Sequence, residues 1–588
     1  MRDSGMTEPT PRYRWIMPAL VDPSPELLGG ARARGISRRL LDVLAARGHR
    51  DGDALAALFD DPLAGLHPPA LLPGAPAFRE RIRLARSRGE RVLVLGDFDA
   101  DGLTGLAILV RALRMHGLDA ASYVPRRLEE GHGLSYAAVE RARADGRSVI
   151  VTVDCGISSV EEVRAATDSG IDVLITDHHR IPAVLPPAAV IVDPHLPESR
   201  YPNTHLSGSG VAFKIAQLLA EGDPALMDRT LALADLAAVG SIADVVPLIG
   251  ENRAIVRLGL ARLAMAPCAG LAALLALAGV APERLDTYTV GYTLAPRLNA
   301  VGRMGDADAA AALLVTDDPD EAARLAATLQ AANVQRRELT ATVLAEARLR
   351  AAEEAPGAPL TMVVGDWPVG IIGLVAGRLA DETGRPAVVV SSTSEPWRAS
   401  ARSAGGFDLA AALDACGDVF VRHGGHAAAA GCSLAAERYP EFRRRLLGLA
   451  ASLPRPDPRP GLSLDIVAGA ETVDYVLLRE LARLEGSGDA PPLVGISGLR
   501  VARIRPAKGG HLQLTLRKGR EVIDGICFGR AEDLSGTLHE GQALDVVARL
   551  ASRAFGGFES LQLEIRDVGP AGSLASAGSL AAAGTSAA

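Results

Sequence analysis

Residues 92–102 read VLVLGDFDADG, an apolar run that leads directly into three aspartates at alternate positions. The apolar run predicts a buried β-strand, and Asp97, Asp99 and Asp101 follow its carboxyl end. Three carboxylates within five residues repel one another unless cations neutralise them, which favours a site for hard divalent metals. A calcium-binding EF-hand loop would need glutamate at the twelfth position, where this chain has Ile108. A solvated acidic turn is the alternative for this stretch taken alone.

The same order, a β-branched run and then acidic or imidazole side chains, recurs twice along the chain. Residues 148–153 lead into Asp154, and residues 172–176 lead into the sequence DHH at 177–179. Ligands of open α/β sheets bind beyond the carboxyl ends of the strands, so these side chains are expected to converge on one crevice. Asp244, in the sequence SIADVVPL, is a fourth acidic contributor. Aspartates with one or two imidazoles suit Mn²⁺ or Mg²⁺, and they are enough to hold two ions about 3.5–4 Å apart for hydrolysis of a phosphate ester.

The order of predicted elements indicates a multidomain α/β protein, as does the length of 588 residues. Short β-branched runs alternate with helical patterns between residues 91 and 192, which is typical of a parallel sheet with crossover helices. A long helix is predicted from about Asp317 to Glu354. Beyond it, strands at 360–364 and 387–391 flank a helix that starts near Gly373, which indicates a second, smaller α/β domain.

The last third of the chain reads as a linker and a β-domain. Prolines alternate between residues 454 and 460, and five short antiparallel strands then predict an OB-type barrel. These strands are expected at 499–505, 511–517, 521–528, 543–550 and 560–566. The expected division is an N-terminal segment at 1–76, a catalytic domain at 77–305, a connecting helix at 306–354, a smaller α/β domain at 355–453, a linker and barrel at 454–570, and a disordered tail at 571–588.

Composition places the chain among ordinary globular proteins and excludes a polybasic binder. Its 62 basic and 70 acidic residues give a net charge of −8, which allows an enzyme with a local basic groove. Five scattered cysteines form no CxxC pair, which favours a reducing cytoplasmic location over a disulfide framework. The uncharged residues 263–282 are long enough to span a bilayer, but their eight alanines and two prolines favour a buried Ala/Leu helix. We therefore expect no membrane association.

Four segments resemble, in order and spacing, the four motifs of the DHH phosphoesterase superfamily: 96–102, 153–156, 177–179 and 243–248. The sequence GGHA at 424–427 resembles the motif of the associated DHHA1 domain. The length, the segment around Asn299 and the barrel-like C-terminal region narrow the resemblance to the RecJ family of single-strand-specific 5′→3′ exonucleases. It implies a parallel-sheet DHH domain, joined by a long helix to a smaller α/β DHHA1 domain, and a C-terminal OB-type barrel.

The resemblance also implies roles for the candidate metal residues. Asp154 is the expected bridging ligand of two Mn²⁺ or Mg²⁺ ions, Asp177 is expected to orient the paired histidines, and His179 is expected to face the scissile phosphate. Together with His178, these three residues form the expected catalytic set. The implied metal ligands are Asp97, Asp99, Asp101, Asp154, His178 and Asp244.

Substrate contacts are implied elsewhere in the chain. The sequence PRLNAVGR at 296–303 places two arginines around an asparagine, a pattern able to clamp phosphates, although a surface salt bridge is the alternative. The sequence SARS at 400–403 suits a terminal 5′ phosphate, and the small neighbours of His426 permit close approach of a strand. The chain departs from the family pattern at GHG, residues 131–133, and at WPVG, residues 367–370. The implied contacts are Arg127, Arg297, Asn299, Arg303, Ser400, Arg402, Ser403, Gly424, Gly425 and His426.

A local basic stripe supports nucleic-acid binding by the barrel. Residues 493–520 contain seven basic side chains and no acidic one, which suits a phosphate backbone, with a solvated strand face as the alternative. The candidate contacts are Arg503, Arg505, Lys508, Arg517 and Lys518.

The leading hypothesis is a single-stranded-DNA exonuclease that releases 5′ mononucleotides in repair and recombination. A small-substrate phosphodiesterase of the same superfamily, of the oligoribonuclease or cyclic-dinucleotide type, is the alternative, but such an enzyme would not need a basic barrel. A non-catalytic scaffold is disfavoured because every metal-motif position is intact. The resemblance further implies a monomer whose partners are single-stranded DNA, single-strand-binding protein and a RecQ-type helicase.

Overall fold

The structure is a computed structural model, and it describes residues 8–577 apart from 128, 283–284, 306, 355–356, 453–458, 485–489 and 556–557. The chain divides into two compact units. One unit consists of Asp51–Arg336 and Leu484–Ala490. The other consists of Met1–Arg50, Arg337–Arg483 and Pro491–Ala588.

A five-stranded, wholly parallel sheet organises the first unit, in the order β3-β2-β4-β5-β6. Alternate residues of its strands enter two separate cores, because successive side chains of a strand point to opposite faces. Val92 and Val94 pack in one core, and Leu93 and Leu95 pack in the other. The strands are β2 (Arg91–Gly96), β3 (Asp119–Tyr123), β4 (Val149–Val153), β5 (Asp172–Thr176) and β6 (Val190–Val192). Sequence patterns missed β3, which contains one aromatic and no β-branched residue.

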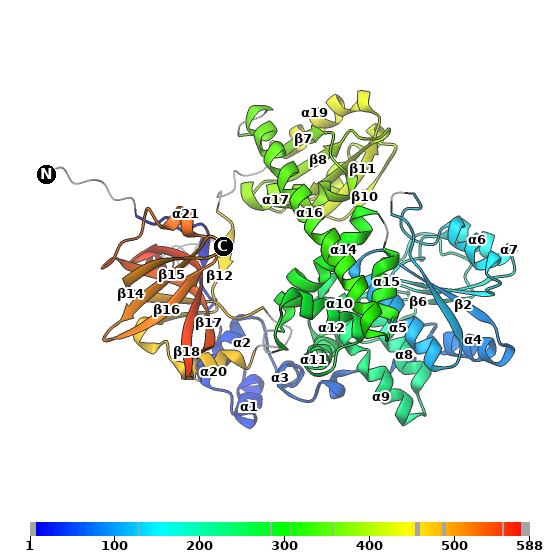
Figure 1. Ribbon diagram of the computed structural model, residues 1–588, viewed down its shortest axis with the longest axis horizontal. Coiled ribbons are helices and arrows are strands. Elements are labelled where there is room, and N and C mark those ends of the chain that lie inside the picture. The colour runs from blue at the N-terminus through cyan, green and yellow to red at the C-terminus, as the bar shows by residue number, and fades with distance from the viewer. Residues whose placement is uncertain are drawn as a thin grey trace. The chain divides into compact units, whose positions relative to one another are not determined.

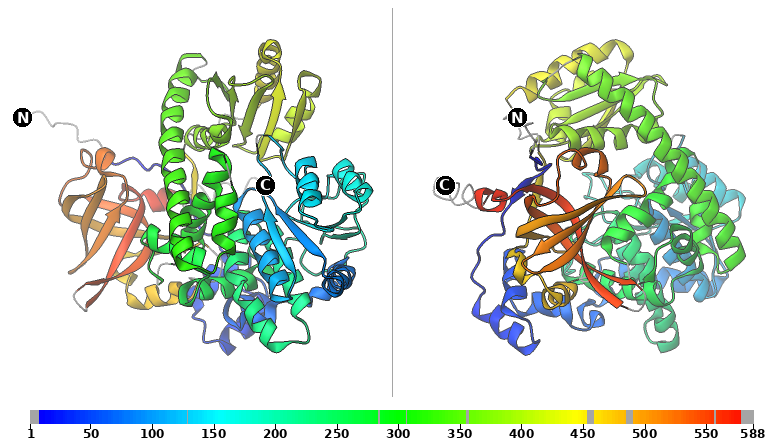
Figure 2. Two further views of the ribbon diagram at one scale, coloured as in Figure 1. Left: turned by 45° about the vertical axis from the view of Figure 1, so that its right-hand side comes forward. Right: turned by 60° about the vertical axis from the view of Figure 1, so that its left-hand side comes forward.

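Helices cover both faces of this sheet. The core with Val92 and Val94 includes side chains of α4, α5, α8 and α10, whereas the core with Leu93 and Leu95 includes side chains of α6 and α7. Figures 1 and 2 show α5 and α8 packed side by side. The bounds are α4 (Ala75–Arg88), α5 (Ala100–Met115), α6 (Tyr136–Ala144), α7 (Val160–Asp168), α8 (Gly208–Ala220) and α10 (Ala234–Ala243).

The uncharged stretch 263–282 does not form one buried helix. Helix α11 (Gly250–Met265) ends before Pro267 and α12 (Ala269–Ala278) follows at an angle of 73°. The expected Ala/Leu helix is present as α12, whose Leu271 and Leu274 are buried, but it covers only part of the stretch, and Met265 at the end of α11 is 74% exposed. Among the described residues no single helix is long and apolar enough to cross a membrane. Other helices of the first unit are α3 (Gly52–Phe59), two 3-10 turns (Pro62–Gly65 and Pro69–Leu71), α9 (Pro224–Ala232), α13 (Thr287–Thr289), a π-helical turn Val290–Leu294, α14 (Ala295–Met304) and α15 (Asp308–Val315).

The predicted long helix is present as α16 (Pro319–Glu354), seen as a straight rod in Figure 2. The range 306–354 also contains α15, so it is not a single helix. After α16, a five-stranded sheet in the order β10-β11-β9-β8-β7 packs α17 on one face and α18 and α19 on the other. Its elements are β7 (Thr361–Gly365), α17 (Val369–Thr383), β8 (Ala387–Ser391), β9 (Trp397–Arg402), α18 (Leu409–Asp414), β10 (Arg422–Gly425), β11 (Ala429–Leu434) and α19 (Tyr439–Ala450).

The C-terminal strands close into a barrel, because β14 pairs with both β15 and β17. All five predicted strands exist, but the expectation that every pairing is antiparallel was wrong, since β16 and β18 run parallel. The barrel strands are β14 (Val494–Ala507), β15 (His511–Lys518), β16 (Glu521–Cys527), β17 (Ala543–Phe555) and β18 (Phe558–Pro570), with β13 (Ile466–Gly469), α20 (Tyr475–Ala482) and α21 (Ala531–Leu534) beside them.

The first part of the N-terminal segment, up to Arg50, belongs to the same compact unit as this barrel, whereas residues 51–76 belong to the other unit. In the first part, strand β1 (Arg14–Ile16) pairs with β12 (Gly461–Ser463), and helices α1 (Pro25–Ala33) and α2 (Arg38–Ala46) follow. The indole of Trp15 donates to Asp567 Oδ2 at 2.9 Å and packs with Leu574. Residues 573–577 are helical and Leu574 is buried, so the predicted disorder was wrong there, and residues 578–588 lie outside the described residues.

Candidate metal centre

The three aspartates after β2 are held in place by the start of α5. Asp99 is the N-cap residue, and its Oδ1 accepts the backbone N–H groups of Asp101 and Gly102 at 3.0 and 3.1 Å. Position 102 has to be glycine, because a Cβ there would lie 2.6 Å from both the N and the O of Asp97. The turn therefore sets Asp97, Asp99 and Asp101 at the carboxyl edge of the sheet.

Asp101 is positioned by a second helix, α8. Its Oδ2 accepts the backbone N–H of Gly208 at 2.6 Å, and its Oδ1 accepts that of Ser209 at 3.0 Å. Ser207 caps the same helix and its hydroxyl lies 3.0 Å from those of Ser209 and Ser241. The helix N-terminus stabilises this buried carboxylate because its N–H groups carry partial positive charge.

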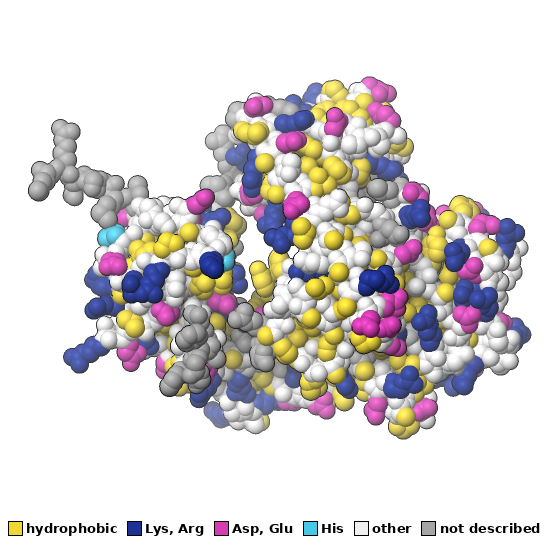
Figure 3. Space-filling view, viewed as in Figure 1, with side chains coloured by type: hydrophobic (Ala, Val, Ile, Leu, Met, Phe, Trp, Pro, Cys, Tyr) yellow, Lys and Arg dark blue, Asp and Glu magenta, His cyan; other side chains and the backbone are white. Residues whose placement is uncertain are grey.

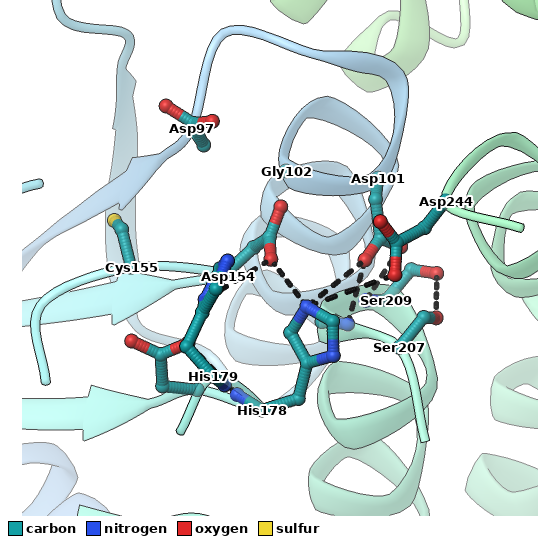
Figure 4. A network of polar contacts seen from close by, with 12 residues as sticks. Asp97, Asp101, Gly102, Asp154, Cys155, His178, His179, Ser207, Ser209 and Asp244 are labelled. Carbon is teal, nitrogen blue, oxygen red and sulfur yellow. Dashed lines mark hydrogen bonds and ion pairs between the residues drawn. The ribbon is translucent and has the colours of Figure 1, made fainter. Parts of the chain in front are cut away.

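His178 lies at the middle of the acidic cluster. Its Nε2 is 3.0 Å from Asp154 Oδ1, 3.8 Å from Asp244 Oδ2 and 4.0 Å from Asp101 Oδ2. Figure 4 shows His178 between Asp154 on one side and Asp101 and Asp244 on the other. Three carboxylates from separate parts of the chain thus converge at this imidazole.

Two residues of the site adopt left-handed backbone conformations. Asp154 has a φ of 60°, and so does Val245, which follows Asp244. Aspartate tolerates this region, but a β-branched valine adopts it only at a cost of about 1–3 kcal/mol. They are the two non-glycine residues with positive φ in the described chain, and both lie at the proposed metal ligands.

Asp177 is fully buried and fixes the orientation of His179. Its Oδ1 accepts the backbone N–H of His178 at 2.8 Å and contacts His179 Nδ1 at 2.7 Å, while Oδ2 accepts the N–H of Ile157 at 3.0 Å. Burial acts to raise the pKa of Asp177, but the His179 hydrogen bond and charge hold that pKa below its usual range. The same bond raises the pKa of His179 to about 9. The imidazolium Nε2 of the half-exposed His179 can therefore donate to a phosphate oxygen.

Burial and mutual repulsion raise the pKa values of three other carboxylates of the site. Burial, together with the charges of Asp97 and Asp101, raises the pKa of Asp99 to about 6. Burial and the charge of Asp101 raise the pKa of Asp244 to about 7, and burial and Asp101 likewise raise the pKa of Asp154. Such shifts are expected where several carboxylates share a site that cations normally neutralise.

The donor set fits divalent cations. Three groups of side chains have ligand atoms within 4.8 Å of one another. Two of them share no residue: Asp97, Asp99 and Asp154 form the first, and Asp101, His178 and Asp244 form the second. The third, Asp154, His178 and His179, overlaps both. In addition, Asp97 Oδ1 is buried and has no hydrogen-bond partner among the described residues. Oxygen-rich groups with one imidazole suit Mn²⁺ or Mg²⁺. Cations held there supply Lewis-acid stabilisation of charge on phosphate oxygens and activate water.

Arg127 and His132 lie beside the first group. The Arg127 guanidinium stacks 4.9 Å from the centre of the Phe98 ring, and burial lowers its pKa despite the charges of Asp97 and Asp99. His132 has its Nδ1 3.5 Å from Asp97 Oδ2 and its ring centroid 4.5 Å from that of Phe98. Both side chains are therefore placed to contact a substrate that binds at this centre.

The segment 296–303 supports the metal loop from the other side. The Asn299 side-chain oxygen accepts the Ala100 N–H at 2.7 Å, at the start of α5. Arg297 donates to Gln330 and to the carbonyl of Thr293. Arg297 and Asn299, which were predicted to contact phosphate, therefore also form hydrogen bonds within the protein. Arg303 lies on the last turn of the same helix.

Sequence reasoning missed two parts of this centre. Asp193 follows β6, is fully buried, and has an Oδ2 without a hydrogen-bond partner among the described residues. Burial raises its pKa to about 7. The rule that polar residues at strand ends converge would have found it. The Ser207-Gly208-Ser209 contact with Asp101 has no such local signal, because it joins residues more than 100 positions apart.

The predicted DHHA1 contacts gather at one end of their own sheet. Arg402 pairs in register with Ala429, and Gly425, His426 and Ala429 form the turn between β10 and β11. Gly425 has a φ of 140°, and a Cβ there would lie 2.5 Å from the Ala429 oxygen.

The predicted contacts of this domain differ in their surroundings. His426 is exposed, and Arg402 Nη1 donates to Ser400 Oγ at 3.3 Å. The Ser403 hydroxyl instead donates to the Phe407 carbonyl, and Gly424 is exposed on β10.

The barrel carries most of the predicted basic residues on its surface, and Figure 3 shows Lys and Arg side chains on its visible face. Arg503, Arg505, Lys508 and Arg517 are exposed. Arg500 lies directly opposite Arg517 across β14 and β15, a like-charge pair that is unfavourable without a bound anion. Lys518 departs from the prediction: it is largely buried and donates to the Val473 carbonyl at 2.7 Å, so it holds the barrel together.

These features define a metal-dependent phosphoesterase of the DHH type with an added OB domain. The sequence matches the DHH family N-terminal domain at residues 91–241, the DHHA1 domain at 358–451 and the RecJ OB domain at 464–567. It is 34% identical to the single-stranded-DNA-specific exonuclease RecJ of Salmonella typhimurium, covering 90% of this chain and 95% of that protein. The chain therefore belongs to the RecJ family.

Further comparisons agree with this assignment. RecJ of Bacillus subtilis is 35% identical and the match covers 90% of this chain and 68% of that protein. The crystal structure of Thermus thermophilus RecJ in complex with Mn²⁺ superposes with a TM-score of 0.77 at 30% identity, covering 95% of this chain and 79% of that one. The same protein in complex with Mg²⁺ superposes with a TM-score of 0.72.

Proposed function

We propose that this protein is a single-stranded-DNA-specific exonuclease that digests from the 5′ end, releases 5′ mononucleotides with two Mn²⁺ or Mg²⁺ ions, and acts in DNA repair and recombination. The observation that carries the proposal is the convergence of six candidate ligands at one sheet edge, in a chain similar over most of its length to exonucleases of that name. The two groups of donors suit two ions at a phosphodiester.

Individual side chains have separable tasks in this proposal. The carboxylates of Asp97, Asp99, Asp101, Asp154 and Asp244, with His178, hold the ions. Asp177 keeps His179 protonated and aimed, so that His179 can donate to an oxygen of the scissile phosphate. We assign catalysis to residues 77–305, substrate binding to 355–453 and nucleic-acid binding to 454–570.

A substrate panel tests the proposal against a small-substrate phosphodiesterase. Purified protein with Mn²⁺ is offered a single strand of about 40 nucleotides, long enough to span several binding sites, the same sequence as a blunt duplex, and di- and trinucleotides. We expect release of mononucleotides from the single strand and sparing of the duplex. Cleavage of the short substrates with the long strand intact would favour the alternative, and the basic barrel would then need another explanation.

Arg402→Ala is expected to reduce the preference for a 5′-phosphorylated end over a 5′-hydroxyl end. A forked guanidinium beside Ser400 suits a terminal phosphate dianion, and removing such a hydrogen bond costs about 1.5–3 kcal/mol. The ratio of kcat/KM for the two ends measures the effect. Arg398→Ala, on the same strand, is the matched control and should keep the wild-type ratio. An unchanged ratio in the Arg402 variant removes it from a phosphate pocket.

Combining Arg503→Ala with Arg505→Ala is expected to weaken single-strand binding and to flatten its salt dependence. Removing one arginine–phosphate ion pair changes the slope of log K against log salt by about 0.7 for a single strand. Fluorescence anisotropy over a salt series measures this slope. Lys518→Met is the contrast: it should lower the thermal stability of the barrel and leave the slope unchanged. Equal slopes for wild type and the double variant would reject this DNA-binding face.

The partners and location follow from the family resemblance. We infer that single-strand-binding protein and a RecQ-type helicase act with this exonuclease in the cytoplasm. The local charge of the barrel, the scattered cysteines and the activity proposed for the catalytic unit support this setting.

A further inference from the structure

An exposed aromatic pair lies on the helical segment that also supports the proposed catalytic centre, and it has no part in the mechanism above. The rings of Tyr288 and Tyr292 stack with centroids 4.4 Å apart and planes inclined by 26°. Tyr292 is 72% exposed and Tyr288 is 47% exposed. Aromatic residues make up only 4% of this chain, so two large rings stacked at the surface are out of keeping with its composition.

The helical segment that carries the pair contacts the candidate metal site at two points. Towards its C-terminal end, Asn299 caps the start of α5, and a Cβ on Gly302 would lie 2.8 Å from the Phe98 oxygen. Within its π-helical turn, a Cβ on Gly291 would lie 3.6 Å from Ile242, two residues before Asp244. π-Helical turns are rare and occur frequently at functional sites.

The segments near the candidate metal centre combine exposed apolar surface and positive charge. Val245, next to Asp244, is 83% exposed, and Ile249 is 55% exposed. Arg297 and Arg303 lie on the same helical segment as the two tyrosines. Exposed rings with guanidinium groups nearby suit a strand that presents both bases and phosphates.

We propose that Tyr288 and Tyr292 form a stacking platform for the bases of the single-stranded substrate beside the scissile phosphate. This inference rests on the proposed exonuclease function and adds a base-recognition site to it. In a duplex both faces of each base are already stacked and its edge is paired, so only an unpaired strand can offer a base to the platform. Aromatic stacking accepts every base, so the platform favours single strands without selecting a sequence.

The test compares Tyr292→Ala with Tyr292→Phe, which keeps the ring and removes only the hydroxyl. Removal of the ring on which one base stacks is expected to raise KM for a 5′-phosphorylated single strand about 5- to 50-fold in the alanine variant. The phenylalanine variant should stay close to wild type, and kcat should change much less than KM. Thermal melting shows whether each variant is folded, and the Tyr288→Ala variant provides a second, independent removal of the pair.

A second experiment removes bases from the DNA substrate and leaves the tyrosine rings in place. Wild type is assayed on a strand in which the nucleotides that follow the terminal one are abasic, and KM should rise to the value of the alanine variant. That variant should not distinguish the abasic strand from the normal one. Equal KM values for Tyr292→Ala, Tyr292→Phe and wild type, or for wild type on both strands, overturn the platform. Failure of wild type to digest any single strand would instead refute the proposed function itself.

Discussion

Asp154→Asn is expected to lower exonuclease turnover at least about 10³-fold while leaving single-strand binding largely intact. Asp154 contacts both groups of the candidate metal centre, since it is a member of one and lies 3.0 Å from His178 of the other. The amide keeps the shape of the carboxylate but removes its charge. Turnover on labelled single strands and binding in chelator measure the two effects separately.

Asp154→Asn is also expected to change how the stability of the protein depends on metal. Burial and the charge of Asp101 raise the pKa of Asp154 in the absence of cations, so a neutral amide should not destabilise the metal-free protein. Wild type should gain about 2.7 kcal/mol when Mn²⁺ is added to about 100 times its dissociation constant, and the variant should gain much less. Asp145→Asn, at the C-terminal end of α6 and ion-paired with Arg141, is the matched control for the Mn²⁺ effect. Full Mn²⁺ stabilisation of the Asp154 variant would remove this residue from the metal site.

Gly208→Ala is expected to reduce activity and metal affinity about 10²-fold without altering any candidate ligand. A Cβ at this position would lie 2.4 Å from Asp154 Cβ and 2.8 Å from its Oδ1. The helix start or Asp154 must therefore shift, and the Gly208 N–H that binds Asp101 shifts with it. Initial rates over a Mn²⁺ titration would show a higher metal requirement.

Gly210→Ala is the control for this experiment. It lies in the same first turn of α8, but the nearest atoms to its Cβ would be those of side chains, Leu206 at 3.3 Å and the Ser207 hydroxyl at 3.4 Å. Alanine is also the better helix former, so this variant should fold and retain activity. If both alanine variants kept wild-type activity and Mn²⁺ requirement, α8 would have no role in positioning Asp101 and Asp154.

The motif-bearing parts of this site could be predicted from the sequence because strand ends are local signals. Asp97, Asp154 and Asp177 each follow an apolar run directly, and parallel pairing then brings them to one edge. Asp193 follows the same rule after β6, which falls in the β-branched run that ends at residue 192, so this residue could have been identified in the same way.

What could not be predicted depends on contacts distant in the sequence. The strands β9 and β10 read WRASAR and RHGG, with one β-branched or aromatic residue between them, and they are stable because they pair within their sheet. The Lys518 side chain is largely buried because it donates a hydrogen bond to the carbonyl of Val473, 45 residues earlier in the chain. The burial of Leu574 depends on Trp15, at the other end of the chain.

One digestion experiment tests the central claim most directly. A single-stranded DNA of one sequence is labelled at its 5′ end or at its 3′ end and incubated with Mn²⁺, with Mg²⁺ or with chelator. The proposed function predicts early release of labelled mononucleotide from the 5′-labelled strand, gradual shortening of the 3′-labelled strand, and no digestion in chelator. Early release of the 3′ label, or digestion that persists in chelator, would contradict it.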